Sequence, residues 1–126
     1  MGRKAAGVPQ KRRSKYGAVK VTIDGVTFAS KAEGRRYLEL LARHVVIRNL
    51  ELQPRFPLKG ADGSIVGVYV ADFRYQESKH RHWPDGEFEA WTEDVVEDVK
   101  GVKTPVYRLK KKLFEAQYGI TIREVR

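Results

Sequence analysis

The segment "VVEDVKG", Val95–Gly101, begins with the paired valines of a buried strand and then places charged residues among the apolar ones. Because side chains alternate between the two faces of a strand, Asp98 and Lys100 point the same way and Glu97 points the opposite way. An acid and a base therefore share one face at the end of an apolar strand. We interpret Glu97 as a supporting residue on the other side, although a register shift of one residue would exchange it with Asp98.

A second apolar segment, "SIVGVYVADFRYQ" at 64–76, predicts a strand that alternates in the same way. One face carries Tyr69, Ala71, Phe73 and Tyr75, and Asp72 lies on the other face, near the end of the apolar run. The polar stretch 77–94, with a turn at Pro84–Gly86, is interpreted as a long hairpin connection to a strand at about 94–100. If the two strands pair as a hairpin, Asp72 and Asp98 become neighbours across the ladder.

The flanking segments predict a compact set of further elements. Asp24-Gly25 favours a hairpin turn, and Ser30 with Glu33 forms a capping box that starts a helix over 31–44. This helix is expected to bury Tyr37, Leu40, Leu41 and His44, and Gly34 within it indicates close approach by another segment. A turn near Asn49 and an edge or irregular strand containing Pro54 and Pro57 should follow.

A second helix is predicted over 105–118, because Thr104-Pro105 is a typical helix start and Gly119 a typical stop. Its expected inner stripe is Val106, Leu109, Leu113 and Ala116, and a last strand follows in "ITIREV". We therefore expect a single α/β domain over 19–126, with a central mixed sheet of four or five strands and flanking helices.

The composition limits the classes of function. The 126 residues include no cysteine and no apolar run long enough for a transmembrane helix or a secretory signal, so a cytoplasmic protein is expected. The net charge of +9 favours nucleic acid as a partner, with an anionic membrane surface or simple solubility as the alternatives. Residues 1–18 have no acidic residue and predict a disordered basic arm, whose Arg12, Arg13 and Lys15 could lie along phosphates.

The two aspartates point to a divalent cation. Carboxylates that are forced together repel, and one takes up a proton unless a cation lies between them. Mg²⁺, or Mn²⁺ in its place, needs only one or two carboxylates and keeps several waters. The backbone carbonyl of Val99 could add another oxygen, and Lys100 could face the water or a phosphate. Hydrolysis of a phosphodiester requires such a set of groups.

The order Asp72, then Asp98-Val99-Lys100, resembles the D…(D/E)-x-K signature of the PD-(D/E)XK nuclease superfamily. The chain is similar to small phage-encoded nuclease-like proteins and, more loosely, to phage junction-resolving endonucleases and the TnsA-type transposon nuclease. The segments that carry this likeness are "SKAEGRRY", "LELQPRFPL", "YVADFRY", "VVEDVKG" and "YRLKKKLFEAQYGI".

The resemblance implies a restriction-endonuclease-like core and a set of catalytic residues. Asp72 and Asp98 would be metal ligands, Lys100 would position the water or stabilise charge, and Glu33 would complete the acidic cluster. Ala71 stands where the signature has proline. The literal Pro84-Asp85 is rejected because it lies in a turn-like polar stretch.

Other residues are expected around this site. Arg108, Lys111 and Lys112 on the second helix could bind phosphates beside the cut, or could form an ordinary solvated face. Gln53 is expected to lie beside the ligands as a supporting residue. Trp83 is the better candidate for stacking on bases and Trp91 for the core, while His80 and His82 are interpreted as plain surface.

The sequence thus predicts an Mg-dependent endodeoxyribonuclease, phage-encoded and acting on duplex or branched DNA. Two coupled cuts would require a homodimer. The alternative is a non-catalytic nucleic-acid-binding protein that uses the basic arm and the basic helix.

Overall fold

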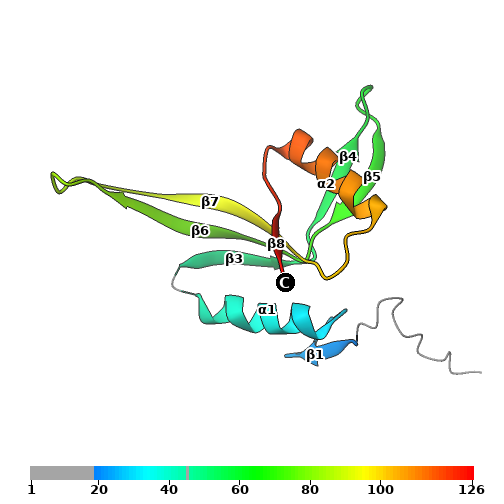
Figure 1. The fold of residues 1–126 in the computed structure, drawn as a ribbon, viewed down its shortest axis with the longest axis horizontal. Helices are drawn as coiled ribbons and strands as arrows, with labels where there is room; N and C mark the ends of the chain where they lie inside the picture. The colour runs from blue at the N-terminus through cyan, green and yellow to red at the C-terminus, as the bar shows by residue number, and fades with distance from the viewer. Residues whose placement is uncertain (1–18, 45) are drawn as a thin grey trace, which may run out of the picture. The chain divides into compact units, whose positions relative to one another are not determined.

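The computed structural model describes residues 19–44 and 46–126, so the predicted basic arm with Arg12, Arg13 and Lys15 lies outside the described residues. Two compact units divide the chain between Arg35 and Arg36, inside the first helix. The elements follow the order β1 (Val21–Ile23), β2 (Val26–Phe28), α1 (Lys31–Ala42), β3 (Ile47–Leu52), β4 (Arg55–Lys59), β5 (Ile65–Val70), β6 (Phe73–His82), β7 (Phe88–Val99), α2 (Pro105–Tyr118) and β8 (Arg123–Val125) (Figure 1).

The first unit is a hairpin followed by the first turns of α1. Asp24 and Gly25 both have positive φ, 51° and 79°, as a type I′ turn between β1 and β2 requires. The Ser30 hydroxyl accepts a hydrogen bond from the Glu33 amide at 3.2 Å and caps the helix. A Cβ atom on Gly34 would lie 2.6 Å from Cγ2 of Val21. The predicted turn, cap and close approach are therefore confirmed.

The second unit is built on a four-stranded mixed sheet of order β3-β6-β7-β8. The first two pairings are antiparallel, and β7 and β8 are parallel. These elements confirm the predicted α/β class and the predicted mixed sheet of four strands with helices beside it. No helix in the described part of the chain is long and apolar enough to cross a membrane.

The two faces of this sheet are covered by different helices. Residues of odd number on β6 and β7 contact α1 from Arg36 onward, through the pairs Arg36–Glu97 and Arg43–Glu77; we call this the Glu97 face. The opposite face, here the Asp98 face, packs against α2. Its core comprises Phe56, Leu58, Tyr69, Ala71, Val96, Tyr107, Phe114 and Ile122.

The prediction that 77–94 forms a long connection is wrong. β6 and β7 stay in register over ten pairs, from Phe73↔Glu97 to His82↔Phe88. Only Trp83–Glu87 form the turn, closed by a 2.9 Å hydrogen bond from the Trp83 amide to the Glu87 carbonyl. The outer half of the hairpin is exposed, so its residues carry no apolar alternation that would indicate a strand.

The predicted single strand over 64–76 is divided. β5 ends at Val70 and pairs with β4, whereas β6 starts at Phe73 in the central sheet. Asp72 therefore lies where the chain passes from one sheet to the other. The four residues predicted to share one face are all buried, but they do not share it. Tyr69 and Ala71 belong to the core of the Asp98 face, whereas Phe73 pairs with Glu97 and the Tyr75 hydroxyl bonds to Glu97 on the opposite face, so this part of the prediction is wrong.

Irregular backbone explains why the segment 46–60 also differs from expectation. Asn49, predicted as a turn, has φ 59° inside β3, where the register with β6 shifts between Arg48 and Glu51. Gln53, at φ 50°, and Pro54 then separate β3 from β4. The extended chain is therefore two short strands in two different sheets.

Both predicted helices form, although α1 ends at Ala42 and not at residue 44, and their buried faces differ from the predicted ones. On α1 Leu40 is buried and Tyr37 half-buried, whereas Leu41 is 41% exposed and His44 lies in an exposed turn. On α2 the Thr104 cap and the Gly119 stop are confirmed, with Thr104 Oγ1 accepting from the Tyr107 amide.

The predicted inner stripe of α2 is wrong, because its aliphatic residues are exposed: Val106, Leu109, Leu113 and Ala116. Tyr107 and Phe114 are buried instead. The ring of Phe114 packs edge-on against Phe56, with centroids 4.8 Å apart, and lies 5.2 Å from Tyr69. Large aromatic rings contribute most of the free energy of burial, so Tyr107 and Phe114 decide which face of the helix turns inward.

Candidate active site

Asp72 and Asp98 meet where β6 and β7 stop pairing. Phe73 is paired with Glu97, so continuing the register by one residue brings Asp72 opposite Asp98. The Asp72 amide donates to the Glu97 carbonyl at 3.1 Å, and Asp72 Oδ2 accepts from the Val99 amide at 2.6 Å. Residues opposite each other on one face of a ladder have Cβ atoms about 5 Å apart. The predicted neighbourhood of the two aspartates is therefore what the pairing produces.

The Asp98 carboxylate is buried and engaged on both oxygens. Lys100 Nζ lies 3.0 Å from Oδ1, and the Tyr69 hydroxyl donates to Oδ2. Burial, and then the hydrogen bond to Asp98, raise the pKa of Tyr69, so that this hydroxyl remains a proton donor at neutral pH. Sequence reasoning assigned Tyr69 only to the core, because its ring packs there and alternation does not show where the hydroxyl ends.

Lys100 is three-quarters buried and rests on an aromatic ring. Its Nζ is 4.2 Å from the ring centroid of Tyr107, which favours a cation there. The Lys100 amide donates to the Val125 carbonyl at 2.8 Å, which fixes the backbone beside β8. An ammonium group is thus held next to the carboxylate of Asp98 and remains reachable from solvent.

Glu97 is held on the other face of the strand. Its side chain is fully buried and accepts from Arg36 Nε at 2.8 Å and from an Arg36 terminal nitrogen at 2.6 Å. The Tyr75 hydroxyl also donates to it, and burial followed by this bond raises the pKa of Tyr75 to about 12. Glu97 therefore points away from Asp98, as the alternation predicts.

Glu124 is a further carboxylate on the Asp98 face. It lies opposite Asp98 in the parallel register of β7 and β8. Its carboxylate accepts from the Tyr107 hydroxyl at 2.7 Å and forms ion pairs with Lys103 at 2.8 Å and Lys111 at 3.3 Å. The Lys103 ammonium, and then the Tyr107 hydroxyl, hold the pKa of Glu124 at about 2. No sequence pattern indicates this residue, since only tertiary pairing places β8 beside β7.

The donor set suits a hard cation that keeps waters. Among residues 19–44 and 46–126, no three His, Cys, Asp or Glu side chains are arranged to hold a metal. Asp72 and Asp98 supply two carboxylates, and the Val99 amide donates to Asp72. The part of the Val99 carbonyl as a ligand stays a prediction. Mg²⁺ is bound in this manner, whereas structural zinc requires four protein ligands. The residues present fit Mg²⁺ with water completing its coordination.

The remaining residues assigned from the sequence are distributed as follows. The Gln53 amide donates to the Asp72 carbonyl at 3.0 Å, so Gln53 adjoins the site through its backbone. Arg108 and Lys112 are exposed on α2, and Lys111 pairs with Glu124. Glu33 lies in the first turn of α1, in the unit that ends at Arg35, and its place beside the aspartates stays a prediction.

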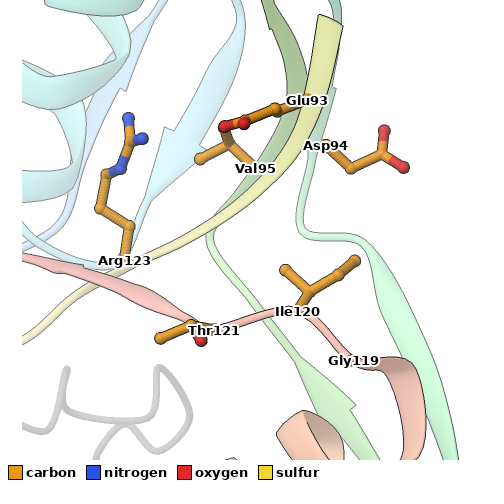
Figure 2. Close-up of a pocket in the computed structure, with 7 residues that line it drawn as sticks. All are labelled: Glu93, Asp94, Val95, Gly119, Ile120, Thr121 and Arg123. Atoms are coloured by element: carbon orange, nitrogen blue, oxygen red, sulfur yellow. The ribbon is translucent and has the colours of Figure 1, made fainter.

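A shallow open pocket lies elsewhere in the second unit. It is lined by Glu93, Asp94, Val95, Gly119, Ile120, Thr121 and Arg123. Figure 2 shows Glu93 and Val95 on one side of β7 and Asp94 on the other. Neither of the paired aspartates nor Lys100 lines it, so we do not place the chemistry there.

Comparison with known proteins gives one family. No curated protein and no solved structure matches the chain. Residues 13–125, most of the chain, match the family described as "Protein of unknown function (DUF1064)". The match includes both aspartates, Lys100 and the whole of the central sheet, and the chain therefore belongs to the DUF1064 family.

Proposed function

We propose that the protein is an Mg-dependent endodeoxyribonuclease of the PD-(D/E)XK type that hydrolyses phosphodiester bonds. The observation that carries this proposal is the end of the β6–β7 ladder: its last pair, Phe73↔Glu97, is flanked by Asp72 on one strand and Asp98 on the other, and Lys100 Nζ lies 3.0 Å from Asp98. A buried strand end that collects two carboxylates and one ammonium is costly unless these groups have ligands to bind. The net charge of +9 supports a polyanionic substrate.

Each residue has a role that follows from its contacts. Asp72 and Asp98 would hold the cation, with the Val99 carbonyl beside them. The cation would neutralise charge on the scissile phosphate and lower the pKa of a water. Lys100 can donate hydrogen bonds to that water or to a phosphate oxygen, and Tyr69 keeps the Asp98 carboxylate oriented. We also propose that the central sheet and its helices form a restriction-endonuclease-like core, and that Glu33 completes the acidic cluster.

The DNA would lie over the outer surface of α2 near the site. Arg108 and Lys112 are exposed there and make no ion pair among the described residues, so both are available to phosphates. Such contacts position a duplex without reading its sequence, which suits an enzyme that selects branched DNA by shape. Lys111 is the weaker candidate, because Glu124 already neutralises it.

A cleavage assay tests the proposal. Wild-type protein should cut duplex, single-stranded or branched DNA with Mg²⁺, and both Asp98→Ala and Lys100→Met should abolish cutting. Asp94→Asn is the matched control, because Asp94 is an exposed acid on the same strand and the same face. If wild type cuts none of these substrates faster than Asp98→Ala does, the catalytic proposal fails.

A non-catalytic nucleic-acid-binding protein is the second candidate. It is favoured by the ion pair between Lys100 and Asp98, because each of these groups already neutralises the other. It predicts DNA binding that weakens steeply with salt and is indifferent to Mg²⁺. Asp72→Asn would leave this binding unchanged. The two candidates differ in the Mg²⁺ dependence of both binding and cutting.

A further inference from the structure

The ammonium group of Lys100 has two neighbours that could fix its position. Its Nζ lies 3.0 Å from Asp98 Oδ1 and 4.2 Å from the ring centroid of Tyr107. A lysine side chain is a compact charge on a flexible stem, so its place in a site depends on what holds it. The contact with Asp98 is lost when that carboxylate binds a cation instead. The ring of Tyr107 remains, because an aromatic face attracts an ammonium group without the help of Asp98.

The ring of Tyr107 is held along its edge and at its tip. Tyr107 is buried in the core of the Asp98 face, and its ring centroid lies 6.5 Å from that of Tyr69. At the tip, the hydroxyl donates a 2.7 Å hydrogen bond to Glu124 Oε2. A buried ring that is also hydrogen-bonded has little freedom to turn, so the face that lies under Lys100 keeps its position.

The carboxylate that holds this ring is itself held. Glu124 Oε1 lies 2.8 Å from Lys103 Nζ, and Oε2 lies 3.3 Å from Lys111 Nζ. Glu124 belongs to β8, and the next residue of that strand, Val125, accepts a 2.8 Å hydrogen bond from the Lys100 amide. The last strand therefore fixes the backbone of Lys100 and, through Glu124, the ring below its ammonium group.

We propose that Tyr107 and Glu124 are positioning residues for Lys100. The ring of Tyr107 holds the ammonium group beside the metal site once Asp98 binds a cation, and Glu124 holds the ring. This inference rests on the proposed nuclease function, in which Lys100 acts on the water or on a phosphate oxygen. Neither positioning residue touches the substrate, since Tyr107 is buried and the Glu124 carboxylate already contacts three side chains.

Proton–carbon NMR of the full chain tests the contact without any need for nuclease activity. Protons that lie over the face of an aromatic ring resonate upfield, so the Lys100 protons next to Nζ should be shifted upfield in wild type. The signal that Lys100→Met removes identifies them. Tyr107→Leu should abolish the shift, Tyr107→Phe should retain it, and Glu124→Ala should reduce it. The shift should persist when Mg²⁺ is added, because the ring and not Asp98 maintains it.

Single-turnover cleavage at saturating DNA and Mg²⁺ tests the consequence. Tyr107→Leu should slow cutting by about three- to thirtyfold, which is the range for loss of a cation–π contact, with the DNA dissociation constant unchanged. Tyr107→Phe should slow it less, and Glu124→Ala should match Tyr107→Phe, because either change removes the same hydrogen bond. The two changes together should be no slower than either alone. Val106→Ala, at a position 63% exposed on α2, is the control, and thermal unfolding verifies that each variant is folded.

The two measurements separate this inference from the nuclease proposal. Lys100 protons that are not shifted in wild type, or a shift that Tyr107→Leu leaves intact, overturn the positioning role. So do equal losses of rate in Tyr107→Leu and Tyr107→Phe, because the ring would then be irrelevant, and losses from Tyr107→Phe and Glu124→Ala that add. A wild type that cuts no DNA refutes the nuclease proposal instead, and the NMR shifts still decide whether Tyr107 and Glu124 hold Lys100 in place.

Discussion

The ion pair between Arg36 and Glu97 allows a quantitative test of how β7 carries charge in a buried position. Glu97 is fully buried, whereas the Arg36 side chain is 16% exposed. Arg36→Met would leave a buried carboxylate whose one remaining direct donor, among the residues that the structure describes, is the Tyr75 hydroxyl. Removing one partner of a buried pair costs about 3–5 kcal/mol, and two hydrogen bonds of 2.8 and 2.6 Å place this pair at the strong end.

The reverse substitution should cost less. Glu97→Gln keeps an acceptor for Tyr75, and the Arg36 guanidinium that it leaves can still reach water, so we expect about 1–3 kcal/mol. Combining Arg36→Met with Glu97→Gln removes both charges and should be more stable than Arg36→Met alone. The double variant therefore measures the penalty of the unpaired carboxylate.

Urea unfolding followed by circular dichroism gives these free energies, provided that the slope stays constant among variants. Glu39→Gln is the control: Glu39 also pairs with Arg36, at 3.0 Å, but is 52% exposed and should change stability by less than about 0.5 kcal/mol. A loss below about 1 kcal/mol for Arg36→Met, or a double variant no more stable than Arg36→Met, would refute the assignment of Glu97 as a buried charge that needs its partner.

Three further predictions follow from other contacts. Gly34→Ala should destabilise the protein by about 1–3 kcal/mol in thermal unfolding, because the new methyl group would overlap the β1–β2 hairpin, although the same change in an open helix stabilises by about 1 kcal/mol. Tyr69→Phe should slow DNA cleavage at unchanged fold, since Asp98 loses the donor that orients it; an unchanged rate contradicts this role. The pKa of Glu77 is lowered to about 2, chiefly by the hydrogen bond from Arg123, so its contribution to stability is complete above about pH 4.5 and is lost as the pH falls toward 2. Between about pH 4.5 and 2, the free energy of unfolding of Glu77→Gln should therefore fall less steeply with pH than that of wild type, as urea unfolding at each pH would measure.

The parts of the fold that the sequence predicted depend on short-range chemistry. The Asp24-Gly25 turn, the Ser30 cap and the stop at Gly119 each follow from the conformational needs of a few neighbouring residues. The placement of Asp72 beside Asp98 needed only strand alternation and one hairpin, which together fix the register.

The parts that the sequence did not predict depend on tertiary context. The division at Ala71–Asp72 separates two sheets and moves the buried side chains from one face to the other, although buried and less buried residues keep alternating through it. No local pattern therefore marks the break. The outer part of the β6–β7 hairpin, Lys79–Trp91, is mostly exposed, and its apolar residues have no regular spacing that would indicate a strand. On α2, the aliphatic stripe and the aromatic residues Tyr107 and Phe114 each predict a different buried face. The aromatic face is buried because the rings that pack against it come from strands distant in the sequence. Glu124 enters the site only through parallel pairing of β8 with β7.

Adjacent carboxylates on β7 show why one strand can serve both structure and chemistry. Glu97 and Asp98 are both buried, and each has its own tyrosine donor and its own cation, on opposite faces. The cation of Glu97 comes from a helix and binds through two nitrogens, which locks it. The cation of Asp98 is Lys100, the residue directly after the end of β7, which makes a single 3.0 Å contact.

This difference decides which pair can open. A lone ammonium on a flexible side chain that is 25% exposed can turn toward an incoming phosphate, and the carboxylate that it leaves can bind a cation instead. A bidentate guanidinium over a fully buried carboxylate cannot do so without a large loss of stability. Lys100→Met should therefore abolish cleavage with a small change in the free energy of unfolding, and Arg36→Met should mainly lower stability. Equal losses of stability in the two variants would contradict this division of roles, because Asp98 would then depend on its cation as strongly as Glu97 does.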